Sequence, residues 1–145
     1  MTGDYNTAVG RNALEALADD GTLGNTAVGY AAGGLMVTNK NNTIMGYSAF
    51  DAADAGEDKN VVIGSLAGSA INDAGSDDNV LIGYNAGLGG IATIQQCVAI
   101  GAEAMDGTDT INSINNVFIG FQSGTGAWAS TQSTDNIGIG SNTMA

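Results

Sequence analysis

Apolar residues recur in one short pattern along the whole chain, and polar, Gly-rich segments of variable length separate the copies. Each copy reads approximately Asn-X-X-Ile/Val-Gly-X-X-Ala, and successive copies begin 17 to 20 residues apart. The eight copies begin at Asn6, Asn25, Asn42, Asn60, Asn79, Cys97, Asn116 and Asn136. A repeat of this length does not bury an apolar face alone, so the copies are expected to stack on one another. The pattern predicts an all-β parallel solenoid of about eight coils, with residues 1–145 as a single repeat-array domain.

The three residues after each leading Asn predict a short strand. The first and third of them, such as Val80 and Ile82, share one face because side chains alternate along a strand, and they are mostly β-branched. We expect these two rows to point inward. The residue between them, such as Leu81, is apolar as well. A strand that is apolar on both faces is covered on both faces, so the pattern also predicts packing against other chains.

Glycine closes every strand and indicates either a positive φ angle or a close approach of two backbones. A small residue follows three positions later, for example Ala67, and we expect it to begin a second short strand. The leading Asn residues are expected to form a ladder of amide hydrogen bonds from coil to coil. The segment ALEALADD, from Ala13, has the composition and apolar spacing of a short helix. We favour the β-solenoid repeat over this helix.

Composition narrows the possible functions. The net charge of -12, from 15 acidic and 3 basic residues, opposes binding to nucleic acid or to anionic membranes. No stretch is long enough to insert into a membrane, and the first ten residues do not resemble a signal peptide. The single cysteine, Cys97, excludes an intrachain disulfide. Because the repeats run to both ends without a polar cap, we expect the chain to be a fragment of a longer fibre.

The string NTAVGYAAG, with its variants NTIMGYSAF, NVLIGYNAG and NVFIGFQSG, resembles repeats of bacteriophage tail fibres. More loosely, it resembles the head repeats of trimeric autotransporter adhesins. The adhesin resemblance implies a left-handed parallel β-roll in which three chains form an intertwined or side-by-side homotrimer. The tail-fibre resemblance implies a non-enzymatic structural and adhesive segment of the virion, a rigid rod that presents loops to a host-surface receptor. The alternative is a bacterial adhesin head on the extracellular cell surface.

An enzymatic alternative rests on VIGSLAG, which starts at Val62 and resembles a hexapeptide of the left-handed β-helix acyltransferases. Those enzymes use histidine as the general base, and this chain contains none. Cys97 has no evident activating base, and Lys40 and Lys59 lack the glycine spacing of a phosphate-binding loop. We therefore expect no catalytic residue, no cofactor and no enzyme activity.

Acidic loops offer oxygen ligands that calcium accepts. The two groups are Asp51, Asp54, Glu57 and Asp58, and Asp73, Asp77 and Asp78. Neither group matches the spacing of an EF-hand or of the Gly-Asp nonapeptide of calcium-binding β-rolls. Solvated acidic loops are favoured, and no metal site is expected.

Aromatic residues suggest a binding surface. Tyr30, Tyr47, Tyr84 and Phe121 each follow a corner glycine, so they are expected to form a broken row along one edge of the rod. Such rings stack either on one another or on the sugars of a host cell-surface polysaccharide. Trp128, in the loop TGAWAST, is the best single candidate for an exposed contact residue that meets a polysaccharide or protein receptor, and the alternative is that it covers an open edge of the core. These five residues are the candidate receptor-binding set.

Overall fold

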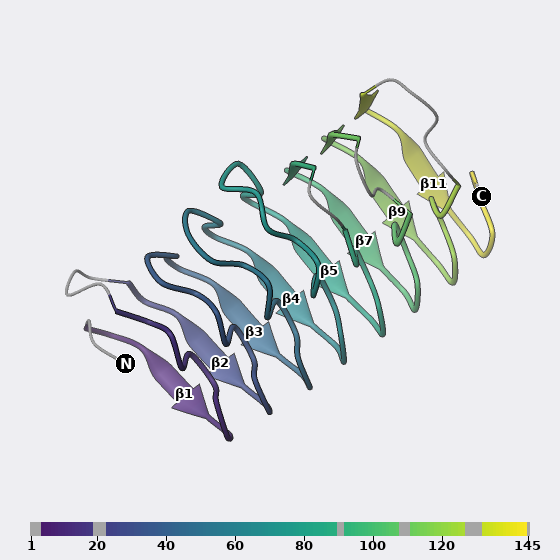
Figure 1. Cartoon of the computed structure of the whole chain (residues 1–145). Helices are drawn as coiled ribbons and strands as arrows, with labels where there is room; N and C mark the ends of the chain where they lie inside the picture. The colour runs from purple at the N-terminus through teal and green to yellow at the C-terminus, as the bar shows by residue number, and fades with distance from the viewer. Residues whose placement is uncertain (1–3, 19–22, 90–91, 108–110, 127–131, 145) are drawn as a thin grey trace.

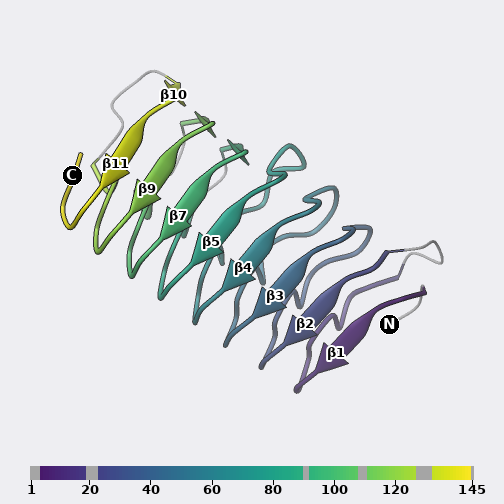
Figure 2. The same cartoon turned by 180° about the vertical axis from the view of Figure 1, so that it is seen from behind.

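The computed structural model describes residues 4–18, 23–89, 92–107, 111–126 and 132–144. Within these ranges the protein is all-β, without a helix, and its parallel sheet forms a β-solenoid (Figure 1). The chain makes about 6 turns of about 19 residues, fewer than the predicted eight coils. All eight motif copies nevertheless supply a strand. The two termini lie at opposite ends of the rod (Figures 1 and 2).

The main sheet contains eight parallel strands in the order β1-β2-β3-β4-β5-β7-β9-β11. They are β1 (Thr7–Val9), β2 (Thr26–Val28), β3 (Thr43–Met45), β4 (Val61–Ile63), β5 (Val80–Ile82), β7 (Val98–Ile100), β9 (Val117–Ile119) and β11 (Ile137–Ile139). Equivalent positions of successive copies are in register, as in the pairs Val61↔Val80 and Ile63↔Ile82. The prediction of one strand per copy is confirmed.

A second, smaller sheet contains three parallel strands in the order β10-β8-β6. These strands are β6 (Ile94–Gln95), β8 (Ser113–Ile114) and β10 (Ser133–Thr134), and each comes just before a strand of the main sheet. The small residues after the corner, such as Ala67 and Ala86, are fully buried as expected but lie in turns. The expectation that they begin the second strand is therefore wrong.

The middle residue of each main strand from β2 to β9 points into the solenoid. Ala27, Ile44, Val62, Leu81, Ala99 and Phe118 are all fully buried. The residues on either side of them are half-buried or exposed in every strand of the main sheet. The predicted inward rows are thus the outward rows. Side-chain alternation defines two faces but does not say which is inside when both are apolar, and the narrow interior accepts one side chain per strand.

The size of this middle residue is matched by the residue six positions later. Leu81 is paired with Gly87 and Phe118 with Gly124, and a Cβ on either glycine would lie 2.6 Å from its partner's side chain. In the coil of Ala99 the matching residue is the large, buried Met105. Most coils therefore hold one large side chain at these two positions, which fills the interior at ordinary packing density.

Glycine at the corners is a requirement of the backbone. Gly29, Gly64 and Gly120 have φ angles of +142°, +139° and +137°, a region that only glycine adopts readily. A Cβ at any of them would collide with the carbonyl oxygen of the corner glycine in the next coil. Both readings of the corner glycine, positive φ and close backbone approach, are confirmed.

The predicted asparagine ladder is present. The backbone N–H of Asn60 donates to Asn42 Oδ1 at 2.8 Å, and that of Asn79 donates to Asn60 Oδ1 at 3.0 Å. At Cys97 the ladder changes acceptor, because Asn116 N donates to Cys97 Sγ at 3.5 Å. Cys97 is fully buried, and burial raises the pKa of its thiol. The Cys97 sulfur therefore takes the place of an amide oxygen as the acceptor in the ladder.

Candidate interaction surfaces

The outward face of the main sheet carries two rows of largely apolar side chains. Each of its eight strands presents two residues outward, which makes sixteen side chains in straight rows. From β4 to β11 all of them are Val or Ile, whereas β1, β2 and β3 begin with Thr. The outward residues of β4, β5, β7 and β9 are half-buried, and Ile137 and Ile139 of the edge strand β11 are 71% and 67% exposed. Figure 2 shows the strands of this sheet lying in front, with no described segment across them.

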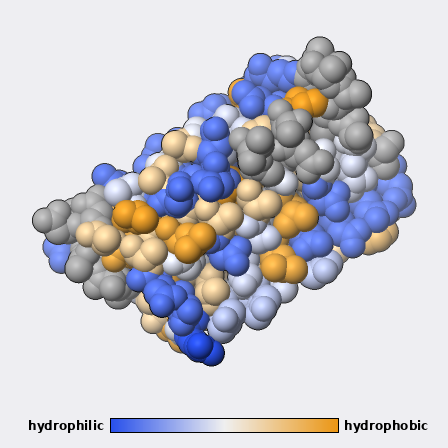
Figure 3. Space-filling model, viewed as in Figure 1, coloured by the Kyte–Doolittle hydropathy of each residue, from blue (hydrophilic) through white to orange (hydrophobic). Residues whose placement is uncertain are grey.

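The opposite wall of the rod has a different character. Seen from the side shown in Figure 1, the turns lie in front of the strands, and hydrophilic and hydrophobic residues form small separate patches (Figure 3). The apolar residues there include Leu35, which is 57% exposed. This wall resembles an ordinary solvated surface, on which scattered apolar residues are normal.

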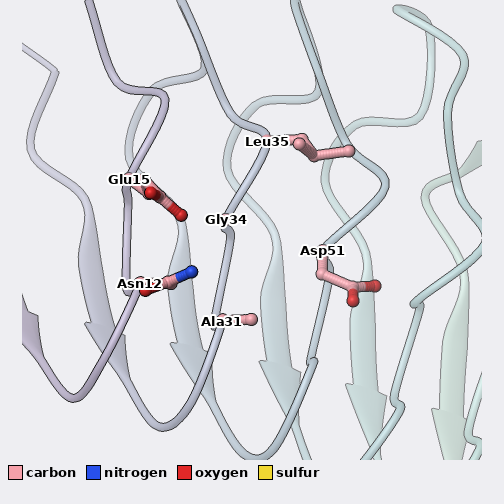
Figure 4. A pocket seen from close by; sticks show the side chains of 6 residues that line it. All are labelled: Asn12, Glu15, Ala31, Gly34, Leu35 and Asp51. Carbon is pink, nitrogen blue, oxygen red and sulfur yellow. The ribbon is translucent and has the colours of Figure 1, made fainter.

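One pocket on this wall has a volume of about 270 Å³. It is lined by Asn12, Glu15, Ala31, Gly34, Leu35 and Asp51 (Figure 4). These residues come from three successive coils, which are joined by hydrogen bonds such as Ala16 N to Gly34 O and Gly33 N to Ala49 O. The strands of the main sheet lie behind the pocket in Figure 4. The sequence interpretation had not identified this site.

The predicted aromatic row is exposed but only partly continuous. The rings of Tyr30 and Tyr47 stack with their centroids 5.3 Å apart and their planes at 13°, and the Arg11 guanidinium lies 5.9 Å from the Tyr30 centroid. Ser65 and Ala102 occupy the equivalent positions in the coils that separate Tyr47, Tyr84 and Phe121. The exposed fractions of the four rings range from 42% to 57%. Trp128 lies outside the described residues.

The acidic loops hold the coils together. Asp58 Oδ1 and Asp77 Oδ1 accept the backbone N–H groups of Lys40 and Asp58, both at 2.7 Å. Asp73 Oδ1 accepts from Gly75 N and from the Thr93 hydroxyl. Within the described ranges, no group of three or more His, Cys, Asp and Glu side chains is arranged to hold a metal ion. These carboxylates therefore have a structural use between neighbouring coils.

Glu57 is unusual because its side chain is fully buried. Glu57 Oε2 accepts a hydrogen bond from Asn39 Nδ2, and Oε1 has no hydrogen-bond partner. Burial raises the pKa of this carboxyl, and the nearby charges of Asp54 and Asp73 act in the same direction. The sequence interpretation had placed Glu57 in a solvated loop, which is wrong for this residue.

No protein-family model matches the chain, and no curated protein or solved structure matches it either. None of the described residues forms a helix long and apolar enough to cross a membrane.

Proposed function

We propose that the chain is a non-enzymatic, structural and adhesive segment of a bacteriophage tail fibre. In this proposal three copies pack side by side through the outward faces of their main sheets and form a rigid rod. The observation that supports it best is the set of sixteen outward side chains, which are β-branched and aliphatic over five consecutive strands. An uninterrupted apolar strip of this kind is typical of a surface that another protein covers.

The architecture suits a load-bearing rod. Every internal strand of the main sheet is hydrogen-bonded on both edges, and the asparagine ladder joins the same coils a second time. Packing three such sheets together would cover the apolar strips and remove the remaining exposure of the half-buried Val and Ile side chains, which favours association. The absence of histidine from the sequence and the burial of Cys97 support a non-enzymatic role.

Light scattering on a sizing column tests the assembly. We expect a mass of three chains, and we expect Ile82→Asp and Ile100→Asp to yield folded monomers because a charge then enters the shared apolar face. Leu35→Asp, an exposed aliphatic position on the opposite wall, is the matched control and should remain trimeric. A wild-type monomer at all concentrations, or trimers in both sheet variants, would refute the proposal.

The proposed adhesive role assigns the exposed rings to a host-surface polysaccharide. Tyr47→Ala removes one partner of the stacked pair, and Trp128→Ala removes the loop candidate. Both variants should keep the wild-type circular dichroism spectrum and bind host cells less well, since ring stacking on sugars is lost. Binding unchanged in both variants would remove the aromatic row and Trp128 from the contact surface.

A further inference from the structure

We propose that the two gaps in the aromatic row, at Ser65 and Ala102, are slots that each bind one terminal pyranose ring of a polysaccharide. The sugar would enter edge-on and lie between two aromatic rings. The walls of the first slot are Tyr47 and Tyr84, and those of the second are Tyr84 and Phe121. The inference rests on the proposed adhesive function, and it specifies which part of the polysaccharide binds and where.

The row is straight because backbone hydrogen bonds join neighbouring coils along its whole length. Its residues are Arg11, Tyr30, Tyr47, Ser65, Tyr84, Ala102, Phe121 and Ser141. From Arg11 to Phe121, each carbonyl oxygen accepts from the second residue after the next corner glycine, as in Leu66 N to Tyr47 O at 2.9 Å. Each step along the row is therefore one strand spacing, about 4.8 Å. The corners that carry the row form one edge of the rod (Figures 1 and 2).

The filled part of the row shows how its rings lie. Tyr30 and Tyr47 stack almost parallel, with centroids 5.3 Å apart and planes at 13°, so each ring turns a face toward its neighbour along the row. Tyr30 lies between Arg11 of the preceding coil and Tyr47 of the following one, and it is 42% exposed. Tyr47 is followed by the small Ser65 and is 57% exposed. A ring beside a gap therefore keeps one face uncovered.

The width of each slot suits a saturated ring. The two walls belong to coils two strand spacings apart, so equivalent ring orientations leave about 5 Å on either side of a ring placed midway. A flat aromatic ring makes its best carbon contacts at about 3.5 Å and would leave one wall untouched. A pyranose is puckered and carries hydrogens on both faces, so it is thick enough to contact both walls within about 4.5 Å. The slots therefore favour a sugar over a nucleobase or another flat ring.

The orientation of the walls favours a terminal sugar. A ring held between them lies across the rod, because the walls face each other along the row. A sugar inside a polysaccharide that runs along the rod would carry a glycosidic bond on both sides, and these bonds would meet the walls. A sugar at a chain end or branch has one such bond, which leads out of the slot to solvent.

The two slots differ at their base. Ser65 has a hydroxyl group there, whereas Ala102 has only a methyl group. Because a hydroxyl both donates to and accepts from a sugar, we expect the Ser65 slot to bind more tightly. The walls and bases of both slots are uncharged side chains, which favours a neutral sugar.

Nuclear magnetic resonance titration of the intact chain tests the proposal with the methyl pyranosides of glucose, galactose, mannose, rhamnose and N-acetylglucosamine. We expect at least one of them to bind saturably and to shift the backbone amides of residues 47–48, 65–66 and 84–85. Its own protons should move upfield on both faces of the sugar ring, because aromatic rings cover both. Sorbitol, which has the hydroxyl groups without a ring, should produce none of these changes.

Substitutions close or weaken the slots. Ser65→Tyr and Ala102→Tyr each place a ring in one gap, so the double variant should abolish binding although it completes the aromatic row. Tyr84→Ala removes the wall that both slots share and should weaken binding about tenfold. Ser141→Tyr adds a ring beyond Phe121, at an exposed position of the same row that closes neither slot. It is the matched control and should bind like the wild type.

Four results would overturn the proposal. These are no saturable binding of any pyranoside, upfield shifts on only one face of the sugar, tighter binding of adenosine than of every pyranoside, and wild-type affinity in the double variant. If the double variant fails to fold, as judged by circular dichroism, Tyr84→Ala decides the outcome because it changes an exposed ring. Wild-type affinity in Tyr84→Ala would then refute the slots.

Host-cell binding separates this proposal from the adhesive function. A folded double variant that binds host cells as well as the wild type would refute the slots and leave the adhesive function in place. A wild-type chain that binds no host cells would refute the adhesive function, and the pyranoside titration would still decide whether the slots bind a sugar.

Discussion

The two faces of the main sheet differ in how much their side chains vary in size. On the outer face β-branched residues dominate from β1 to β11, and they vary little in size. On the inner face the residue ranges from Gly138 to Phe118, and in coils such as those of Leu81, Ala99 and Phe118 the residue six positions later compensates for this size. The inner residue therefore varies in size from coil to coil, whereas the outer rows keep a β-branched residue at every position except Met45. The difference supports the proposal that a neighbouring chain lies along the outer face.

The strongest test places the same charge on the two faces at adjacent positions. Leu81→Asp buries an unpaired carboxylate and should destabilise the fold by more than about 4 kcal/mol. Ile82→Asp should leave the chain folded and remove only the assembly. Chemical denaturation followed by circular dichroism measures the first effect, and light scattering measures the second. Equal loss of folding in both variants would mean that the outer row supports the fold itself.

The second prediction tests the size matching within one coil. Phe118→Ala should cost about 3 to 5 kcal/mol because it leaves a cavity, and Gly124→Leu about 1 to 3 kcal/mol because its side chain meets the Phe118 ring. The double variant should be about 2 kcal/mol more stable than the sum of the two changes. Leucine is acceptable there because Leu14 and Met105 adopt the same left-handed conformation in their coils. Additive costs in a double-mutant cycle would contradict the matching.

The third prediction concerns the buried carboxyl of Glu57. Its pKa is raised above the ordinary value of 4.5, so protonation stabilises the folded state. That stability is fully present below about pH 4.5 and is lost as the pH rises through the raised pKa. Glu57→Gln should therefore increase the free energy of unfolding at pH 7 and flatten its pH dependence above pH 4.5.

Thermal unfolding between pH 4 and pH 8 measures this effect of Glu57. The exposed change Glu15→Gln is the control for removal of one negative charge. If Glu57→Gln destabilises the protein at pH 7, the ionised carboxylate is the form that the fold prefers, and the assigned direction of the pKa shift is wrong.

The smallest expected effect lies in the asparagine ladder. Cys97→Asn should raise the free energy of unfolding by about 1 kcal/mol, because an amide oxygen replaces sulfur as the acceptor for Asn116 N. The introduced NH₂ group can also donate to the Ser113 carbonyl oxygen, which accepts a hydrogen bond from Cys97 Sγ in the wild type. Asn60→Ala is the opposite change and should destabilise. A less stable Cys97→Asn variant would mean that sulfur packing outweighs the lost hydrogen bonds.

The repeat made much of the fold predictable. The strands, the corner glycines and the amide ladder each recur at one place in the motif, so their positions follow from residue type. The sequence did not reveal which face of each strand points inward. Leu81 and Ile82 are both apolar, and side-chain alternation alone does not distinguish the inner face from the outer one. A usable signal was present in the pairs Leu81 with Gly87 and Phe118 with Gly124, since only residues that share a space exchange size in this way.

The pocket and the buried Glu57 were not predictable for a different reason. The pocket is lined by residues of three successive coils, and the pattern within one copy does not say how their turns lie beside one another. Glu57 lies in a loop of ordinary polar composition, and only the path of that loop carries its side chain to Asn39. Features that depend on the packing of neighbouring coils cannot be predicted from the residue pattern within a single copy.

The in-register stacking of the strands also has a consequence for how such a chain can change length. Because the strands of neighbouring coils pair through equivalent backbone atoms, a gene that gains or loses one whole copy keeps the same pattern of strand pairing. A gain or loss of one residue inside a strand would instead turn its core side chain outward. Recombination between copies would thus lengthen or shorten the rod in steps of one strand spacing, about 4.8 Å, while its cross-section stays constant.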